Sequence, residues 1–99
     1  MFEETVGFWI REMLQEGKLH GCDQDFLKQL TKEYAHQLEE FFYREVTLFL
    51  EQSGKAREFE RMMLYDSQYI NKYLNQTIPG YSGFQADIFN KAKKIIFNI

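Results

Sequence analysis

The 99-residue sequence contains only one cysteine and one proline. Because disulfides and zinc frameworks need several thiols, the lone Cys22 excludes an intramolecular disulfide and supplies no zinc framework. This cysteine usage fits a reducing compartment, and we therefore expect a cytoplasmic protein.

Long apolar runs are also absent. The most apolar stretch, VTLFL at 46–50, is far shorter than the roughly 20 residues that span a bilayer. The N-terminal segment MFEETVGFWIREML carries acidic residues where a secretory signal begins with positive charge. These absences predict a soluble chain with neither a signal peptide nor a membrane span.

An excess of positive charge is missing as well, since the net charge is −3 and the isoelectric point is about 5.4. A general nucleic-acid binder neutralises phosphates with a basic face, so the composition argues against that class. The one basic cluster, NKAKK at 90–94, is a single helical turn that complements a helix C-terminus.

No motif of a catalytic or cofactor-binding site is present. Glycine-rich phosphate loops, the G-x-S-x-G elbow, paired C-x-x-C motifs and the dinucleotide-binding fingerprint are all missing from the sequence. His20 and Cys22 are close in sequence, but a nucleophilic thiol needs a positioned base and a third group that orients it. We therefore expect neither enzymatic activity nor a cofactor.

Aromatic side chains are abundant: the chain has ten Phe, six Tyr and one Trp. Each ring brings about 150–250 Å² of surface that favours burial, and a domain of this length has a small interior. We expect some rings to lie at the surface, in a groove or against another chain.

Apolar residues recur at helical spacing along the chain, and no alternating run indicates a strand. The first predicted helix has apolar positions at Phe2, Val6, Trp9, Ile10 and Met13 and ends at Gly17. The last predicted helix has them at Phe84, Ile88, Phe89, Ala92, Ile95, Ile96 and Ile99.

The longest predicted helix runs from Gln24 to about Gln52, after the N-cap residue Asp23. Its predicted apolar stripe consists of Leu27, Leu30, Tyr34, Leu38, Phe41, Glu45 and Phe49, with Phe42 and Val46 beside it. Such a helix is about 43 Å long, whereas a compact domain of this size is roughly 35 Å across. We expect it to bend, break or project, and its apolar second half to need neighbours on more than one side.

Two further segments determine the number of helices. In 55–76, Asp66 falls on the apolar side, so we expect two short helices, with one continuous helix as the alternative. In YLNQTIPGYSGF (73–84), Pro79 moves Ile78 out of the helical region and ends the preceding helix. Ser82 and Gln85 then have the spacing of a capping box for the last helix.

One pattern resembles a metal-binding motif: Glu33 and His36 form an E-x-x-H pair, and Glu40 follows one turn later. Di-metal carboxylate bundles use this spacing because side chains at i and i+3 converge on one face. One chain supplies one copy, so a symmetric dimer would be needed, with Glu12 or Glu16 contributing. We favour the alternative interpretation, a solvated polar face.

A repeat of four residues predicts a partner-binding stripe on a continuous helix, formed by Arg57, Arg61, Tyr65, Tyr69 and Tyr73. Arg and Tyr are enriched at interface hot spots. The alternative is that the Tyr rings edge the core and keep their hydroxyls in water. Phe42 and Phe49, from the apolar half of the long helix, complete the predicted contact set.

Three patterns follow one another along the chain: DFLKQLTKEYAHQLEEFFYREV at 25–46, F-E-x-x-M at 59–63 and I-x-x-Y-L-x-x-x-I-P-x-Y at 70–81. Through them, residues 17–97 resemble a family of small all-helical bacterial domains of unknown function, associated with candidate-phyla bacteria. The resemblance implies an all-α fold and carries no catalytic assignment.

We therefore predict one domain, 1–99, folded as an all-α bundle of four to five helices with one long central helix. The predicted function is protein–protein contact without catalysis, with a second copy as partner in a homodimer. A metal-binding bundle across a dimer axis and a small-ligand carrier with an apolar pocket between helices are the alternatives.

Overall fold

The computed structural model describes residues 2–19, 23–64 and 67–98, which form five α-helices and no strand. The helices are α1 (Glu3–Gln15), α2 (Gln24–Gln52), α3 (Ala56–Met62), α4 (Ser67–Thr77) and α5 (Tyr81–Phe97). The predicted all-α class with one long central helix is thus confirmed. The segment 55–76 contains two helices, as expected, although Asp66 lies outside the described residues.

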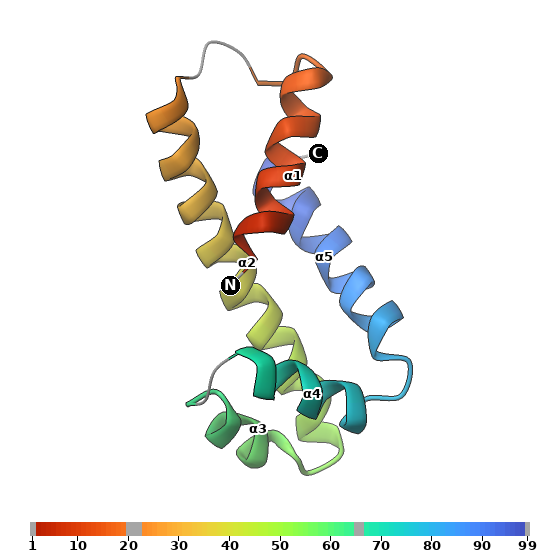
Figure 1. Ribbon diagram of the computed structural model, residues 1–99. Helices are drawn as coiled ribbons and strands as arrows, with labels where there is room; N and C mark the ends of the chain where they lie inside the picture. Colours follow the sequence, from red (N-terminus) through yellow and green to blue (C-terminus); the bar gives the residue numbers. More distant parts are fainter. Residues whose placement is uncertain (1, 20–22, 65–66, 99) are drawn as a thin grey trace.

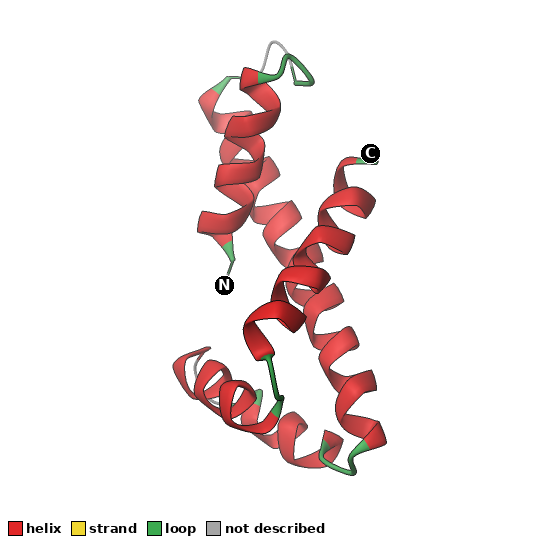
Figure 2. Cartoon of the chain, turned by 90° about the vertical axis from the view of Figure 1, so that its right-hand side faces the viewer, coloured by secondary structure: helices red, strands yellow, loops and turns green. Residues whose placement is uncertain are grey.

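The long helix α2 is the axis along which the other helices pack (Figure 1). α1 runs back along the N-terminal half of α2, and α5 crosses α2 in the opposite direction. α3 and α4 lie across the C-terminal end of α2, which Figure 2 shows from the side. α2 therefore contacts α1 at one end and α3 at the other, with α5 beside it.

The molecule measures 47 × 24 × 17 Å along its principal axes, and its Cα radius of gyration is 15.1 Å. A compact domain of 100 residues has a radius of gyration of about 13 Å. The molecule is therefore more elongated than a typical compact domain of this length. Because the whole molecule is elongated along α2, the long helix spans it without breaking.

Two helix ends follow the sequence closely. The side chain of Asp23 accepts a hydrogen bond from the backbone N–H of Phe26 at 2.7 Å and caps α2. At the other end of α2, Gly54 adopts φ 74°, and the N–H of Lys55 donates to the carbonyl of Leu50 at 2.9 Å. This 6→1 bond is the C-terminal motif that favours glycine in the left-handed conformation.

The predicted capping box at the start of the last helix is wrong. α5 begins at Tyr81, because the carbonyl of Gly80 already accepts a hydrogen bond from the N–H of Phe84 at 3.1 Å. Ser82 is therefore inside the first turn, and the Gln85 side chain donates to the Tyr81 hydroxyl at 3.5 Å. The chain turns instead at Gly80, whose φ of 65° suits a residue without Cβ.

The buried side chains form two clusters. The α1 core consists of Val6, Trp9, Ile10, Ala35, Leu38 and Ala92. The α4 core consists of Phe42, Val46, Leu50, Phe59, Ile70, Leu74, Ile78, Tyr81 and Ile88. Phe2, Phe41 and Phe89 are partly buried and pack against both clusters, so they connect the two ends of the molecule.

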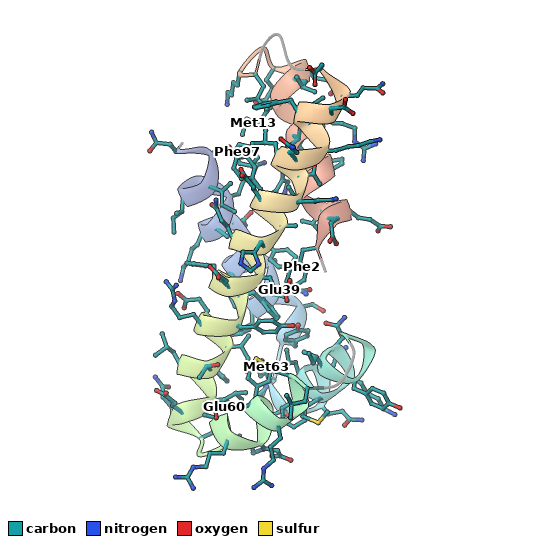
Figure 3. All side chains as sticks on the ribbon, turned by 90° about the vertical axis from the view of Figure 1, so that its left-hand side faces the viewer. Phe2, Met13, Glu39, Glu60, Met63 and Phe97 are labelled. Carbon is teal, nitrogen blue, oxygen red and sulfur yellow. The ribbon has the colours of Figure 1, made fainter. Side chains whose placement is uncertain are left out.

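Aromatic rings continue this connection. The ring of Phe2 meets those of Phe42 and Phe89 edge-on, each at a centroid distance of 5.2 Å. In Figure 3, Phe2 lies midway along the molecule, whereas Phe97 lies beside the N-terminal half of α2. The predicted surplus of rings at the surface is also observed, at Phe8, Phe26, Phe49 and Tyr69.

The core-facing row of α2 differs from the predicted stripe. The buried residues are Ala35, Leu38, Phe42, Val46 and Leu50, whereas Glu45 is half-buried and Phe49 is 36% exposed. From Leu38 onward the buried residues are four apart, so each step rotates the row by about 40° around the helix. The rotation follows the change of neighbours from α1 to α3 and α4.

Leu38 is fully buried in the α1 core, so truncating it leaves a cavity. We expect Leu38→Ala to lower the free energy of unfolding by about 2–5 kcal/mol. Leu64→Ala is the matched control, since Leu64 is 87% exposed, and it should change stability by less than about 0.5 kcal/mol. Urea denaturation followed by circular dichroism measures both, and equal effects would contradict the core assignment.

Burial, reinforced by the nearby Tyr43, raises the pKa of the Tyr81 phenol from 10.0 to about 12. The folded state then holds a proton that the unfolded state loses, so stability declines as pH rises from 10 to 12. The loss amounts to roughly 2–3 kcal/mol. Unfolding measured from pH 9 to 12 should show a weaker decline in Tyr81→Phe, and parallel curves would contradict this origin.

Candidate protein-interaction surface

One side of α2 carries a row of residues that the other helices cover only in part. Gln37, Phe41, Arg44 and Leu48 are spaced by four, three and four residues and therefore share one side of the helix. Leu48 is 51% exposed in this row. An isolated exposed leucine is ordinary, so its neighbours decide whether the row is a surface of interest.

The neighbouring helix α5 borders this row and encloses a shallow cavity with it. The cavity has a volume of about 190 Å³ and is lined by Gln37, Glu40, Phe41, Arg44, Ala92, Ile95 and Ile96. Ile95 is 66% exposed, which is unusual for a residue at the apolar spacing of α5. We call the boundary between α2 and α5, from Ile95 to Phe84, the α2–α5 seam.

At the other end of the seam, Phe49 and Phe84 form an aromatic pair. Their centroids are 4.9 Å apart and their planes are tilted by 55°. Phe49 is 36% exposed and Phe84 is half-buried, so the pair is accessible along one edge. Exposed apolar side chains therefore occur at both ends of the seam, with Ile95 at one end and Phe49 at the other, and Leu48 precedes Phe49 on α2.

The charge on the seam is balanced. Arg44 and Glu40 line the cavity from the same helix, four residues apart. The imidazole Nε2 of His36 lies 3.1 Å from a carboxylate oxygen of Glu40, and both side chains are mostly exposed. A surface with apolar side chains and no net charge is suited to contact with an identical surface.

The predicted contact set is only partly on the surface. Phe42 is 1% exposed and lies in the α4 core, so it is not a surface residue of this chain. Phe49 is exposed and belongs to the seam. Leu48 was missed because it stands one position outside the predicted stripe. Ile95 was missed because its apolar spacing predicted that it would be buried with Ile88, whereas it is 66% exposed.

The predicted Arg/Tyr stripe does not form one helical face. Arg57 and Arg61 lie on α3, whereas Tyr69 and Tyr73 lie on α4, and Tyr65 is outside the described residues. Because α3 ends at Met62 and α4 begins at Ser67, the spacing of four does not continue from one helix to the next.

Tyr73 lies at the edge of the α4 core, as the alternative to a partner-binding stripe predicted. Its ring stacks on Phe59 at 6.5 Å, and its hydroxyl donates a hydrogen bond to a carboxylate oxygen of Glu58 at 3.1 Å. Partial burial and the hydrogen bond to Glu58 raise the pKa of the Tyr73 phenol. The contact fastens α4 to α3.

The possible metal ligands Glu33, His36 and Glu40 all lie on the exposed side of α2. His36 is engaged with Glu40. Within residues 2–19, 23–64 and 67–98, no group of three or more His, Cys, Asp or Glu side chains is arranged to hold a metal ion. A site shared across a dimer axis stays a prediction from sequence, and His20 and Cys22 lie outside the described residues.

Comparisons with known proteins give no further identification. No family model, curated protein or solved structure matches this chain. The resemblance to the helical bacterial family therefore stays a prediction. In the part of the chain that the structure describes, no helix has both the length and the apolar content needed to cross a membrane.

The aromatic pair on the seam is expected to couple α2 to α5. In a double-mutant cycle, Phe49→Ala and Phe84→Ala should show an interaction free energy of about 0.5–1.5 kcal/mol. Chemical denaturation of the parent, both single variants and the double variant measures it. Additive effects of the two substitutions would show that the rings stabilise their helices independently.

Proposed function

We propose that the chain is a protein–protein interaction module that forms a homodimer through the α2–α5 seam. The carrying observation is the exposure of Leu48 on α2 and of Ile95 on α5, the two helices that enclose the small cavity lined by Phe41 and Ile95. Burial of these side chains in an interface favours association, with a free energy of about 25 cal/mol per Å² of apolar surface removed from water.

A two-fold arrangement suits this surface. In a symmetric dimer each contact occurs twice, so a patch must be complementary to itself. The cavity can receive an apolar side chain from the second copy, and Arg44 of one copy can face Glu40 of the other. Because the cavity lining carries one charge of each sign, no net repulsion opposes the contact.

The single cysteine supports a location in the cytoplasm, where unpaired thiols stay reduced. The missing catalytic motifs support a role in binding over a role in chemistry.

Sedimentation equilibrium at micromolar concentration tests the dimer. The parent chain should sediment at twice the monomer mass of 12.0 kDa. Leu48→Glu and Ile95→Glu should each give the 12.0 kDa species, because a desolvated carboxylate in the interface opposes association. Both positions are more than half exposed, so the fold should be unaffected.

Leu64→Glu is the matched control, since Leu64 is 87% exposed in the turn that follows α3, away from the seam. It should keep the mass of the parent. A parent chain that sediments only at 12.0 kDa would overturn the proposed function. A dimer that survives both seam substitutions would place the interface elsewhere.

A further inference from the structure

A second and larger groove lies between α1 and α2, away from the seam. Its volume is about 710 Å³, and it is lined by Glu3, Gly7, Ile10, Arg11, Leu14, Leu27, Lys28, Thr31 and Lys32. The lining comes from α1 and α2 alone, since α5 packs against other side chains of α1. There, Trp9 meets Phe89 and Phe97 at 6.3 and 6.4 Å.

The shape of the groove matches a helix. Its lining residues on α1 extend from Glu3 to Leu14, which is about 16 Å along the helix axis. This length corresponds to about three turns of a helix lying between two antiparallel helices. In a four-helix bundle, that position beside a helix pair is where a further helix packs.

Gly7 is the one glycine in the lining of the groove. It lies within α1, where glycine weakens a helix relative to alanine, and its φ is not positive. A Cβ added at Gly7 would meet nothing within 4 Å, so no packing inside this chain requires a glycine there. Glycine does permit close approach of another backbone from the groove side.

The rim of the groove is cationic although the chain as a whole carries a net charge of −3. Arg11, Lys28 and Lys32 contribute three positive charges, and Glu3 contributes one negative charge. Among the described residues, none of the three cations lies within salt-bridge distance of a carboxylate. The rim is therefore available to pair with acidic groups.

We propose that the α1–α2 groove binds an amphipathic helix of a different protein, with an apolar face flanked by Asp or Glu. The apolar face covers the half-buried Leu14 and Leu27, and the acidic flanks face the cations of the rim. This is recognition of a helix in a groove, in which apolar contacts supply affinity and charge selects the partner.

A second copy of this chain is a poorer occupant. Each groove carries three cations and one carboxylate, so two identical grooves placed face to face would bring together six cations and only two carboxylates. The repulsion between the surplus cations would oppose association. The groove thus differs from the seam, whose charge is balanced, and the present proposal does not rest on the homodimer.

The test uses two synthetic helical peptides of 14 residues with capped ends and a fluorescent label. Both carry leucine along one face; one has glutamate on the flanks and the other has lysine at the same positions. Fluorescence anisotropy against the full chain should show the acidic peptide binding at least about tenfold more tightly than the basic one. The preference should fall as salt is added.

Three variants locate the binding site. Gly7→Gln places a side chain in the groove and should weaken binding of the acidic peptide at least about tenfold. Gly83→Gln is the matched control on α5 and should leave the binding unchanged. The double variant Lys28→Glu with Lys32→Glu should reverse the preference between the two peptides. Circular dichroism confirms that each variant keeps the helical fold.

Four outcomes would overturn the proposal: no binding of the acidic peptide, equal binding of both peptides, unchanged binding to Gly7→Gln, or loss of the homodimer in Gly7→Gln. The last would make a second copy the occupant. Because the homodimer is tested at Leu48 and Ile95 and the groove at Gly7, Lys28 and Lys32, either proposal can fail while the other stands.

Discussion

The contact of one phenylalanine ring with two others, Phe2 with Phe42 and Phe89, holds the two halves of the molecule together. Both contacts are edge-to-face at 5.2 Å, and the three residues come from the chain start, α2 and α5. Phe2 adopts a φ of 71°, a conformation that costs a non-glycine residue about 1–3 kcal/mol. Burial of its ring against both cores offsets that cost, because apolar surface of the ring is removed from water.

The dependence on this contact follows from the elongated shape. With a smallest dimension of 17 Å, the molecule has few positions where a side chain is covered from all sides. Each core is closed by helices on only part of its circumference, so apolar side chains remain on the outer faces. The seam and the α1–α2 groove are two such faces, and both result from a long axial helix with too few residues around it.

Charge distinguishes these two faces. The seam lining carries Arg44 and Glu40 and is neutral, while the groove rim carries a surplus of two positive charges. Burial of apolar area favours association at either face, but it does not determine which partner binds. A neutral face suits a symmetric contact between copies, and a cationic face on an acidic chain suits a different, acidic partner.

The local features of the fold could be predicted from sequence because they depend on residues close along the chain. Asp23 caps α2, Gly54 ends it, and the absence of glycine and proline between them allows one uninterrupted helix. At the last helix the same reasoning failed: Ser82 had the right spacing for a cap, but the turn at Gly80 starts α5 one residue before it.

Only the tertiary structure decided which side of each helix is buried and which surfaces remain. A fixed period of 3.6 residues placed Phe49 in the apolar stripe with Phe42 beside it, and the predicted contact surface included both residues. The buried row instead rotates along α2 as its neighbours change, so Phe42 is covered and Leu48 is left exposed. The sequence by itself determined the all-α class and the extent of the long helix α2, because propensity and capping act locally. The crossing of α5, the seam and the cationic groove arise from packing between distant segments, which periodicity within one helix does not specify.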